Sequence, residues 1–589
     1  MCSVKNLCRR LLWSVGMAAV VFAAFMFVQV TKTIADTNHN YESITSDTTW
    51  TVAGNPHIIT GYVSVNAGAK LTIDPGCIVR FKTGAYLSIG NGWDGDGTGA
   101  LIADGDTANQ ITFDAKYASW HVIRFYDDSD DNSIMDNCIL SEAYYGIECS
   151  SSSPTIQYCT ISGGYYGIAC YGSSSPSIHN CAIQNIDYYG IYINDYNSSP
   201  NISNNTISDC GEYGIYSNTT SSTAVISNNV CNNNGLYPIV LHPMGVISTG
   251  NSGSGNGTDA ILIKFGIVTS NTTWVDQETG FDYVIDDYVY VDDPDSGDVA
   301  ILTIAPGFLV KFGSGGSIQI GYYWYSGEGA LSAVGTDVNP ITFTSKQGSP
   351  VPGDWSGIYF YDKTRDADTI LEHCRIEYAY NGVYCTDASP LIRCSNIKDN
   401  YYGVVGYGST ANPSIQYCNI AGNIYYGVAN GGNTTDINAK NNWWGAANGP
   451  ANDGGGCASG SGDKVSCYVD YASPKVAYHT CTASSTAIEL ASFAAVSDDG
   501  GVTLAWETAT ELDNAGFNVY RSKRKDGAYQ KINNTLITSK GNEVSGANYS
   551  FEDTPGHGAF YYKLEDVDTS GVSTMHGPEK ARVRVRVMK

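Results

Sequence analysis

One phrase recurs along this chain every 21 to 24 residues. SSSPTIQYCTISGGYYGIACYG (151–172) is followed directly by SSSPSIHNCAIQNIDYYGIYIND (173–195). In each copy a proline precedes an isoleucine by two residues, and a tyrosine-rich stretch ends in glycine. These marker glycines are Gly146, Gly167, Gly190 and Gly214, and again Gly382, Gly403 and Gly427. A fixed period in this range is typical of stacked repeats.

The composition of each repeat predicts strands and turns. The segments are short, rich in Ile, Val and Tyr, and separated by Ser, Asn, Gly and Pro clusters, with no helical period. A unit this small cannot bury its own apolar face, so it must stack on copies of itself. We therefore predict an all-β fold: a right-handed parallel β-helix with one coil per repeat and inward Ile, Val and Leu.

The cysteines fall on the same period. Two columns are expected: Cys138, Cys159, Cys181, Asn205 and Asn229, continued by Cys374, Ser395 and Cys418; and Cys149, Cys170 and Cys385. Stacked coils place equivalent residues about 4.8 Å apart, and free Cys packs as a small hydrophobe. We interpret both columns as interior. Thiolate metal binding is the less favoured alternative, because aligned side chains do not enclose a tetrahedral ion. The pair expected to form a disulfide is Cys457 with Cys467.

A longer duplication divides the chain. LTIDPGCIVRF (71–81) matches LTIAPGFLVKF (302–312) at an offset of 231 residues. We predict a first β-helix array at 45–265, a second array at 270–475, and a change of texture after a Ser/Ala/Thr linker. The segment HPMGVISTGNSGSGNGTDA (242–260) is interpreted as the joint.

The N-terminus has the layout of a secretory signal. Lys5, Arg9 and Arg10 precede an apolar run from Leu11 to Val30, and small residues follow it. We predict a cleaved signal peptide at 1–35 and a secreted or outer-surface location. In that case the mature chain has no membrane span. An uncleaved anchor is the alternative, since the run is long enough to cross a bilayer.

Two segments carry family resemblances. NNWWGAANGP (441–450) resembles the closing segment of bacterial exported proteins of the right-handed β-helix repeat class. That class includes lyases, hydrolases, epimerases and non-enzymatic surface proteins, so the resemblance implies the fold and leaves the activity open. Residues 488–589, with VTLAWETATELDNAGFNVYRS, resemble the fibronectin type III-like β-sandwich modules of large exported bacterial proteins. This resemblance implies a spacer, docking or sorting role.

The charge balance restricts the partners. The formal net charge is −26 over 589 residues, which argues against nucleic acid, whose phosphates require Lys and Arg. An acidic surface can collect divalent cations. The densest acidic run, DDSDDNS, makes Asp127, Asp128, Asp130 and Asp131 a candidate Ca²⁺ site, with a solvated turn as the favoured alternative. No other cofactor is expected.

The tyrosine pairs are the candidate binding residues. They are Tyr144 and Tyr145, Tyr165 and Tyr166, Tyr188 and Tyr189, Tyr401 and Tyr402, and Tyr425 and Tyr426. If each pair is extended, one ring points inward and the other outward. The outward rings would form one stripe along the β-helix, as stiffening stacks or as a platform for glycan rings.

Two hypotheses for function follow. The first is an exported, non-enzymatic β-helix protein that binds a polysaccharide or cell-surface glycan, or serves as a structural element. The second is a polysaccharide lyase or glycoside hydrolase with carboxylates on one face. No catalytic set can be assembled from the spacing: Asp187, Asp209 and Asp399 occupy turn-like places, and Arg124 and Arg375 are isolated bases.

Overall fold

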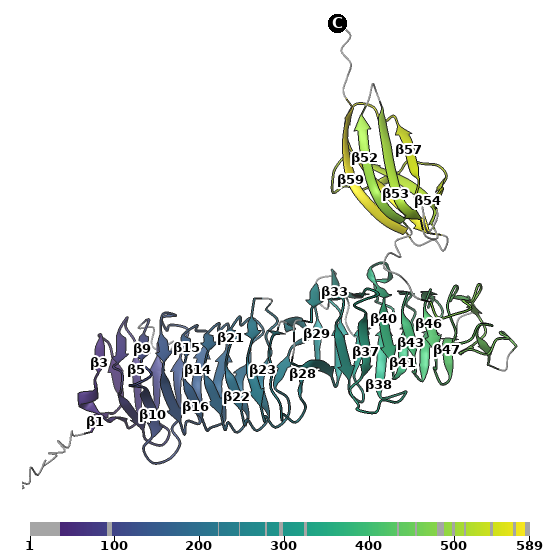
Figure 1. Ribbon diagram of the computed structural model, residues 1–589. Helices are drawn as coiled ribbons and strands as arrows, with labels where there is room; N and C mark the ends of the chain where they lie inside the picture. Colours follow the sequence, from purple (N-terminus) through teal and green to yellow (C-terminus); the bar gives the residue numbers. More distant parts are fainter. Residues whose placement is uncertain are drawn as a thin grey trace, which may run out of the picture.

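The computed structural model describes residues 36–583, apart from 91–96, 222, 247, 277, 279, 294–297, 323–326, 433–434, 454–455, 480–487, 498–500, 512–513, 542–545 and 569–572. The predicted signal peptide at 1–35 lies outside the described residues. From β1 to β51 every strand pair is parallel, and successive coils stack along one axis (Figure 1). The prediction of an all-β fold built on a parallel β-helix is confirmed.

Helical structure is almost absent from the described part of the chain. It consists of three short 3₁₀ turns, η1 (Val52–Gly54), η2 (Pro243–Gly245) and η3 (Asp366–Asp368). Within the same residues no helix is long and apolar enough to cross a membrane.

One 16-stranded sheet, called here the long sheet, passes through both arrays. Its strands are β2 (Glu42–Ile44), β5 (Tyr62–Val65), β8 (Tyr86–Ile89), β11 (Val122–Phe125), β14 (Tyr145–Ser150), β17 (Tyr166–Tyr171), β20 (Tyr189–Ile193), β23 (Tyr213–Ser217), β26 (Ile239–Leu241), β28 (Ala260–Ile263), β31 (Asp282–Ile285), β34 (Leu309–Phe312), β37 (Ile341–Ser345), β40 (Cys374–Glu377), β43 (Asn396–Lys398) and β46 (Asn419–Ala421).

Two nine-stranded sheets complete the first array. One contains β1 (Thr37–His39), β4 (His57–Ile59), β7 (Ile78–Phe81), β10 (Ile111–Ala115), β13 (Cys138–Ser141), β16 (Thr160–Ser162), β19 (Ala182–Gln184), β22 (Thr206–Ser208) and β25 (Val230–Asn232). The other contains β3 (Thr48–Trp50), β6 (Lys70–Ile73), β9 (Ala100–Asp104), β12 (Ile134–Asp136), β15 (Thr155–Gln157), β18 (Ser177–His179), β21 (Asn201–Ser203), β24 (Val225–Ser227) and β27 (Ser248–Thr249).

Three further sheets complete the second array. A nine-stranded sheet, called here the second tyrosine sheet, contains β29 (Gly266–Val268), β32 (Tyr288–Val291), β35 (Ser317–Ile320), β38 (Trp355–Phe360), β41 (Ala379–Thr386), β44 (Tyr402–Tyr407), β47 (Tyr426–Asn430), β50 (Lys464–Val465) and β49 (Ala451–Asn452). A six-stranded sheet contains β30 (Thr272–Trp274), β33 (Val299–Ile304), β36 (Glu328–Val334), β39 (Ile370–Glu372), β42 (Leu391–Arg393) and β45 (Ser414–Gln416), and a closing pair consists of β48 (Ile437–Asn438) and β51 (Val469–Asp470).

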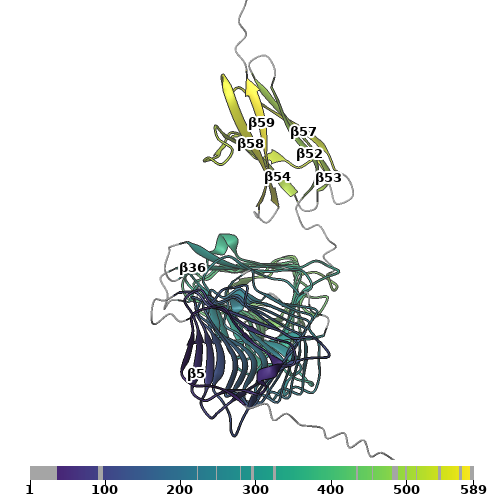
Figure 2. The same cartoon turned by 90° about the vertical axis from the view of Figure 1, so that its left-hand side faces the viewer.

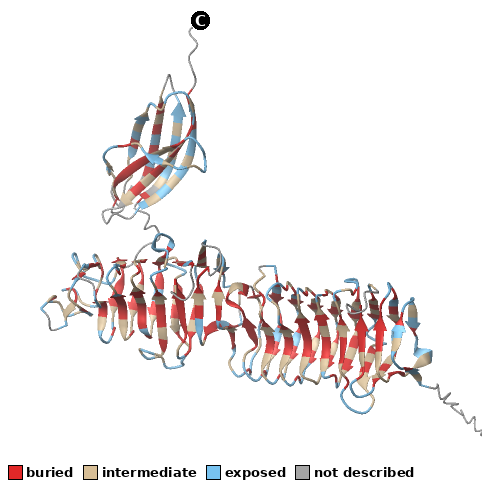
Figure 3. Cartoon of the chain, turned by 180° about the vertical axis from the view of Figure 1, so that it is seen from behind, coloured by how far each residue is buried: buried red, intermediate tan, exposed pale blue. Residues whose placement is uncertain are grey.

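The core is one cluster that runs from Ile44 to Val469. Equivalent isoleucines stack in register, for example Ile156, Ile178 and Ile202. Viewed end on, the coils superimpose (Figure 2), and the buried residues form a continuous band through both arrays (Figure 3). Trp444 of the NNWWGAANGP segment is fully buried in this core, as expected for a side chain that closes its open end.

The two copies of the duplication are out of phase by one sheet. LTIDPGCIVRF forms β6 and β7, and β7 belongs to a nine-stranded sheet of the first array. In the second copy the matching strand, β34, lies in the long sheet. The change occurs at the joint, where β28 follows β26 in the long sheet and its register pairs Ile239 with Ile261. Each motif of the second array therefore occupies the next face of the β-helix.

The cysteine columns are interior, as predicted. Cys138, Cys159 and Cys181 are buried, and so are Cys149, Cys170 and Cys385. Along the first column the thiols give way to amides: Asn205 Nδ2 donates to Asn229 Oδ1 at 2.9 Å, and Asn229 Nδ2 donates to Asn251 Oδ1 at 3.0 Å. Glu278 ends the row by accepting from Asn251 Nδ2 at 2.8 Å. A carboxylate suits the last place because it accepts without needing a partner for a donor of its own.

Residues 488–583 form antiparallel sheets around a separate core that includes Trp506, Phe517 and Tyr562. One sheet contains β52 (Ile488–Ser497), β53 (Val502–Glu511) and β57 (Asn548–Asp553), and the other contains β54 (Asn514–Ser522), β55 (Gln530–Lys531), β56 (Ile537–Thr538), β58 (Gly558–Asp568) and β59 (Ser573–Val583). Tyr520 is half-exposed and donates to Glu565 Oε2 at 2.9 Å.

The amide row generates a stability prediction. Asn229→Ala removes the acceptor of Asn205 inside a dry core, and a buried donor without a partner costs about 1–3 kcal/mol. We expect the urea midpoint to fall accordingly, and to change little for Asn201→Ala, whose side chain is exposed. Equal midpoints for both variants would show that the row does not contribute to stability.

The thiol columns generate a labelling prediction. Burial raises the pKa of Cys210 and of Cys418 to about 12, so both remain thiols at pH 8. Treatment of the native protein with iodoacetamide should leave these cysteines and Cys159 unmodified by mass spectrometry, and urea should expose them. Rapid modification of the native protein would place the columns on the surface.

Candidate functional site

The tyrosine pairs lie outside the core. In the first array, three strands of the long sheet, β14, β17 and β20, begin at the second tyrosine of a pair, which is Tyr145, Tyr166 or Tyr189. The first tyrosine of each pair lies in the preceding turn. All ten rings are half-buried or exposed. The expectation of one inward and one outward ring is therefore wrong.

The marker glycines explain the difference. The paired register skips them, passing from Tyr145 and Tyr166 to Ile147 and Ile168. The alternation of inward and outward side chains therefore starts again after the glycine. The side chain of the tyrosine before it stays outside the core. A Cβ on Gly167 would lie 2.6 Å from the carbonyl oxygen of Gly190, so the close approach of successive coils requires glycine here.

The second tyrosines of the first array form a column on the long sheet. Successive rings Tyr145, Tyr166, Tyr189 and Tyr213 have centroids 5.2–5.6 Å apart. His121 continues the column toward Tyr86 and Tyr62. A parallel column of turn tyrosines, Tyr144, Tyr165 and Tyr188, lies beside it. The neighbouring ring covers each ring face, so the edges and hydroxyls remain for a ligand.

The second array has its own column on a different sheet. Tyr402 and Tyr426 start β44 and β47 of the second tyrosine sheet, with centroids 6.3 Å apart. Tyr401 and Tyr425 flank them at 5.0 Å from each other. The single stripe expected from the sequence is therefore two stripes on two faces, because the second copy is displaced by one sheet at the joint.

The first tyrosine stripe combines protonated phenols with a neighbouring carboxylate. Glu212 accepts a hydrogen bond from Tyr189. A hydrogen bond with Tyr188 raises the pKa of Tyr165 to about 12, and burial raises the pKa of Tyr166. In the column next to the first stripe, Arg124 forms an ion pair with Glu148 (Nε to Oε1, 2.7 Å). Arg124 is therefore not the isolated base that the sequence indicated.

The acidic run at 127–131 forms a turn. Asp130 Oδ1 accepts from the backbone amide of Asn132 at 2.9 Å, and Asp131 Oδ1 accepts from the amide of Ser153 at 2.8 Å. Asp127 is exposed and Asp128 half-buried. In the described part of the chain the one group of three potential metal ligands lies elsewhere, at Glu372, His373 and Cys394. The geometry gives the predicted Ca²⁺ site no support.

The group at Glu372 is also unsuited to a metal. Cys394 is disulfide-bonded, so it has no thiolate to offer. Glu372 Oε2 accepts from Arg393 Nη2 at 3.0 Å. The pair that the sequence predicts to form a disulfide, Cys457 and Cys467, is joined by one, with a Cα–Cα distance of 5.3 Å.

The remaining acidic candidates have a structural explanation. Asp209 and Asp399 have φ of 56° and 55°. This left-handed conformation is one that Asp and Asn tolerate in turns. Asp187 is an exposed turn residue.

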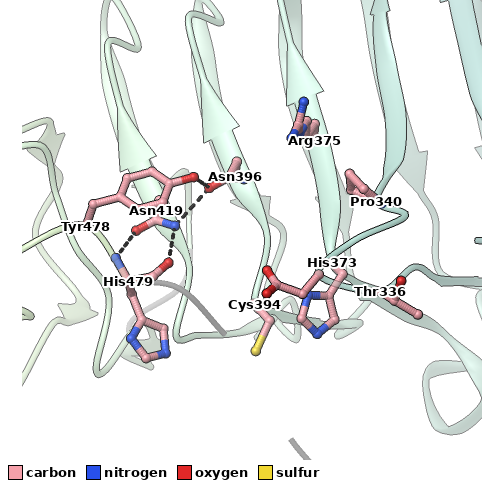
Figure 4. Close-up of a pocket in the computed structure, with 10 residues that line it drawn as sticks. Thr336, Pro340, His373, Arg375, Cys394, Asn396, Asn419, Tyr478 and His479 are labelled. Carbon is pink, nitrogen blue, oxygen red and sulfur yellow. Dashed lines mark hydrogen bonds between the residues drawn. The ribbon is translucent and has the colours of Figure 1, made fainter. Parts of the chain in front are cut away.

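A cavity of about 140 Å³ lies on the outer face of the long sheet in the second array (Figure 4). Its wall includes His373, exposed Arg375 and Asn396. The segment after β51 closes one side: Tyr478 Oη donates to Asn396 Oδ1 at 2.7 Å, and Asn419 Nδ2 donates to the carbonyl of His479 at 2.8 Å. No sequence feature predicts this cavity, because nothing in the repeat shows that residues 478–479 return to β46.

A second cavity, of about 440 Å³, lies at the joint. The residues of its walls come from four coils. The sequence predicts the position of the joint but not this cavity. The residues that line it are Tyr196, Thr220, His242, Met244, Lys264, Phe265, Gly266, Ile267 and Thr269.

Comparison with known proteins agrees with this architecture. Residues 98–272 match the family model described as right handed beta helix region. The β-helix is right-handed. No curated protein matches the chain. Right-handed β-helix domains are found in cell-surface proteins and in polysaccharide-degrading enzymes.

Proposed function

We propose that this protein is an exported, non-enzymatic right-handed β-helix protein that binds a glycan along its tyrosine stripes. The supporting observation is the pair of surface columns, in which neutral rings repeat at every coil outside the core. The leader-like sequence at 1–35 supports export. The rings do not fill the core, so packing of the interior does not account for their recurrence.

The stripe has a geometry that suits an extended polymer. Successive coils are translated by about one strand spacing, 4.8 Å, so hydroxyl-bearing ring edges repeat regularly along the axis. Each contact is modest, and binding requires several coils at once. Stacking of a nucleic-acid base on an aromatic side chain contributes about 1–3 kcal/mol to binding. We expect the contact of a sugar with a ring edge to contribute an amount near the lower end of this range.

The non-enzymatic form is preferred because the candidate catalytic groups have other roles. Arg124 is paired with Glu148, and Asp209 and Asp399 hold left-handed turns. A glycosidase needs two carboxyl groups about 5–9.5 Å apart at the scissile bond. Asp209 and Asp399 instead follow β22 and β43, which belong to different arrays. Release of reducing ends or unsaturated uronates from any polysaccharide would establish the lyase or hydrolase alternative.

The proposal predicts the effect of removing two rings. Tyr165→Ala combined with Tyr188→Ala should weaken binding on a glycan array at least about fivefold, since even one ring at the low end of the stacking scale gives this factor. The double variant Tyr165→Phe and Tyr188→Phe keeps both rings and removes both hydroxyls. Its affinity therefore shows how much the hydroxyls contribute to glycan binding.

Tyr158→Ala is the matched control, because Tyr158 is an exposed tyrosine in a turn beside His179. It should bind as the intact protein does, and thermal unfolding should show all variants folded. If the intact protein binds no glycan, or the double Ala variant binds equally well, the stripes are only structural.

A further inference from the structure

The cavity at the joint results from a change in turn length. In the preceding coils, the connection that leaves the long sheet runs from Ile193 to Asn201, from Ser217 to Val225 and from Leu241 to Ser248. At the joint only Lys264 and Phe265 separate Ile263 from Gly266. Three long turns are therefore followed by a short one. The cavity lies beside this change in turn length.

Aromatic rings form two of its walls. Tyr196 is 58% exposed and Phe265 is 51% exposed. Each meets a neighbour edge-on, His242 at 5.7 Å and Tyr290 at 6.1 Å between centroids. These rings differ from the stripe tyrosines, which contact equivalent tyrosines of neighbouring coils in stacked or tilted pairs. Aromatic surface of this kind packs well against the apolar face of a sugar ring.

Lys264 is the one charged residue among those that line the cavity. It is half-buried, and no carboxylate of the described residues forms an ion pair with it. Its Nζ lies 5.9 Å from the centre of the Tyr216 ring. Burial, aided by the nearby Lys264, lowers the pKa of His242 to about 4, so His242 is neutral at pH 7.

Most half-buried Lys and Arg side chains in the described part of the chain have an acidic partner, as Lys311, Lys346 and Arg393 do, but Lys264 has none. Asp and Glu number 58 against 32 Lys and Arg, so carboxylates to pair with a lysine are plentiful. Burying a charge without a partner costs free energy, and an anionic ligand would supply the missing partner. The position also matters, because Tyr216 adjoins Tyr213 at 5.4 Å and thus continues the first tyrosine stripe to the cavity.

We propose that the cavity binds a uronate residue of the glycan. The sugar carboxylate pairs with Lys264, and the sugar ring packs between Tyr196 and Phe265. This inference rests on the proposed function and names its ligand class: an acidic polysaccharide whose chain continues along the first stripe. Gly266 lines the cavity, and a Cβ there would lie 2.7 Å from Pro243 Cδ, so the close packing behind the cavity requires glycine.

The experiment compares polygalacturonate with its methyl ester at physiological salt, because the two differ only in the masked carboxylate. The full-length protein should bind the free acid about tenfold or more tightly than the ester, the scale of a hydrogen bond to a charged group. Lys264→Gln should remove that difference, and Lys264→Arg should keep most of it.

Lys475→Gln is the matched control. Lys475 is also half-buried and lies 5.0 Å from the centre of an aromatic ring, that of Tyr417, but outside the cavity. Its variant should retain the preference for the free acid. Thermal unfolding checks that both variants are folded.

Three results would overturn the inference. These are equal binding of acid and ester, an unchanged preference in Lys264→Gln, or a sulfated polysaccharide without uronates that binds as tightly through Lys264 as the uronate does. Binding of neutral glycans with no uronate preference would leave the proposed function intact. Binding of no glycan at all would contradict the proposed function itself.

Discussion

Parallel, in-register stacking of successive coils is the constraint on which the rest of the structure depends. It places each residue over its counterpart in the next coil, as Ile156 lies over Ile178. The same translation that builds the interior columns of Ile, Cys and Asn builds the exterior columns of Tyr. The marker glycines permit the close approach, and they also decide that the tyrosines stay outside.

The joint changes the phase of this stacking without interrupting the core. The long sheet continues from β26 through β28, yet its strands carry tyrosine motifs before the joint and the cysteine-column motifs after it. The column that contains Tyr216 thus continues to Lys311 and Thr344. In the second array a neighbouring column passes from Thr342 to Arg375 and Asn396. One face of the β-helix is aromatic in the first array and polar in the second, and the cavity with Lys264 lies beside the change.

The repeat period was sufficient to predict the fold and the interior position of the cysteines. The period defines the position of each residue within its coil, so the interior positions of Cys138 and Ile178 can be predicted from it directly. It does not define the phase of the second array, because that depends on turn lengths at the joint. The period also could not show that the strand register skips Gly167, which keeps Tyr166 outside the core. Each cavity joins distant segments, Tyr196 with Lys264 in one and Asn396 with Tyr478 in the other, so no local motif reveals it.

A crystal structure with a bound galacturonate oligosaccharide tests the central claim most directly: that the stacking register, displaced by one sheet at the joint, creates the ligand site. We predict that β26 and β28 are neighbours with Ile239 opposite Ile261, and that a sugar carboxylate lies within hydrogen-bonding distance of Lys264 Nζ. Tyr213 and Tyr402 on the same sheet, or an oligosaccharide bound away from Lys264, would contradict the account.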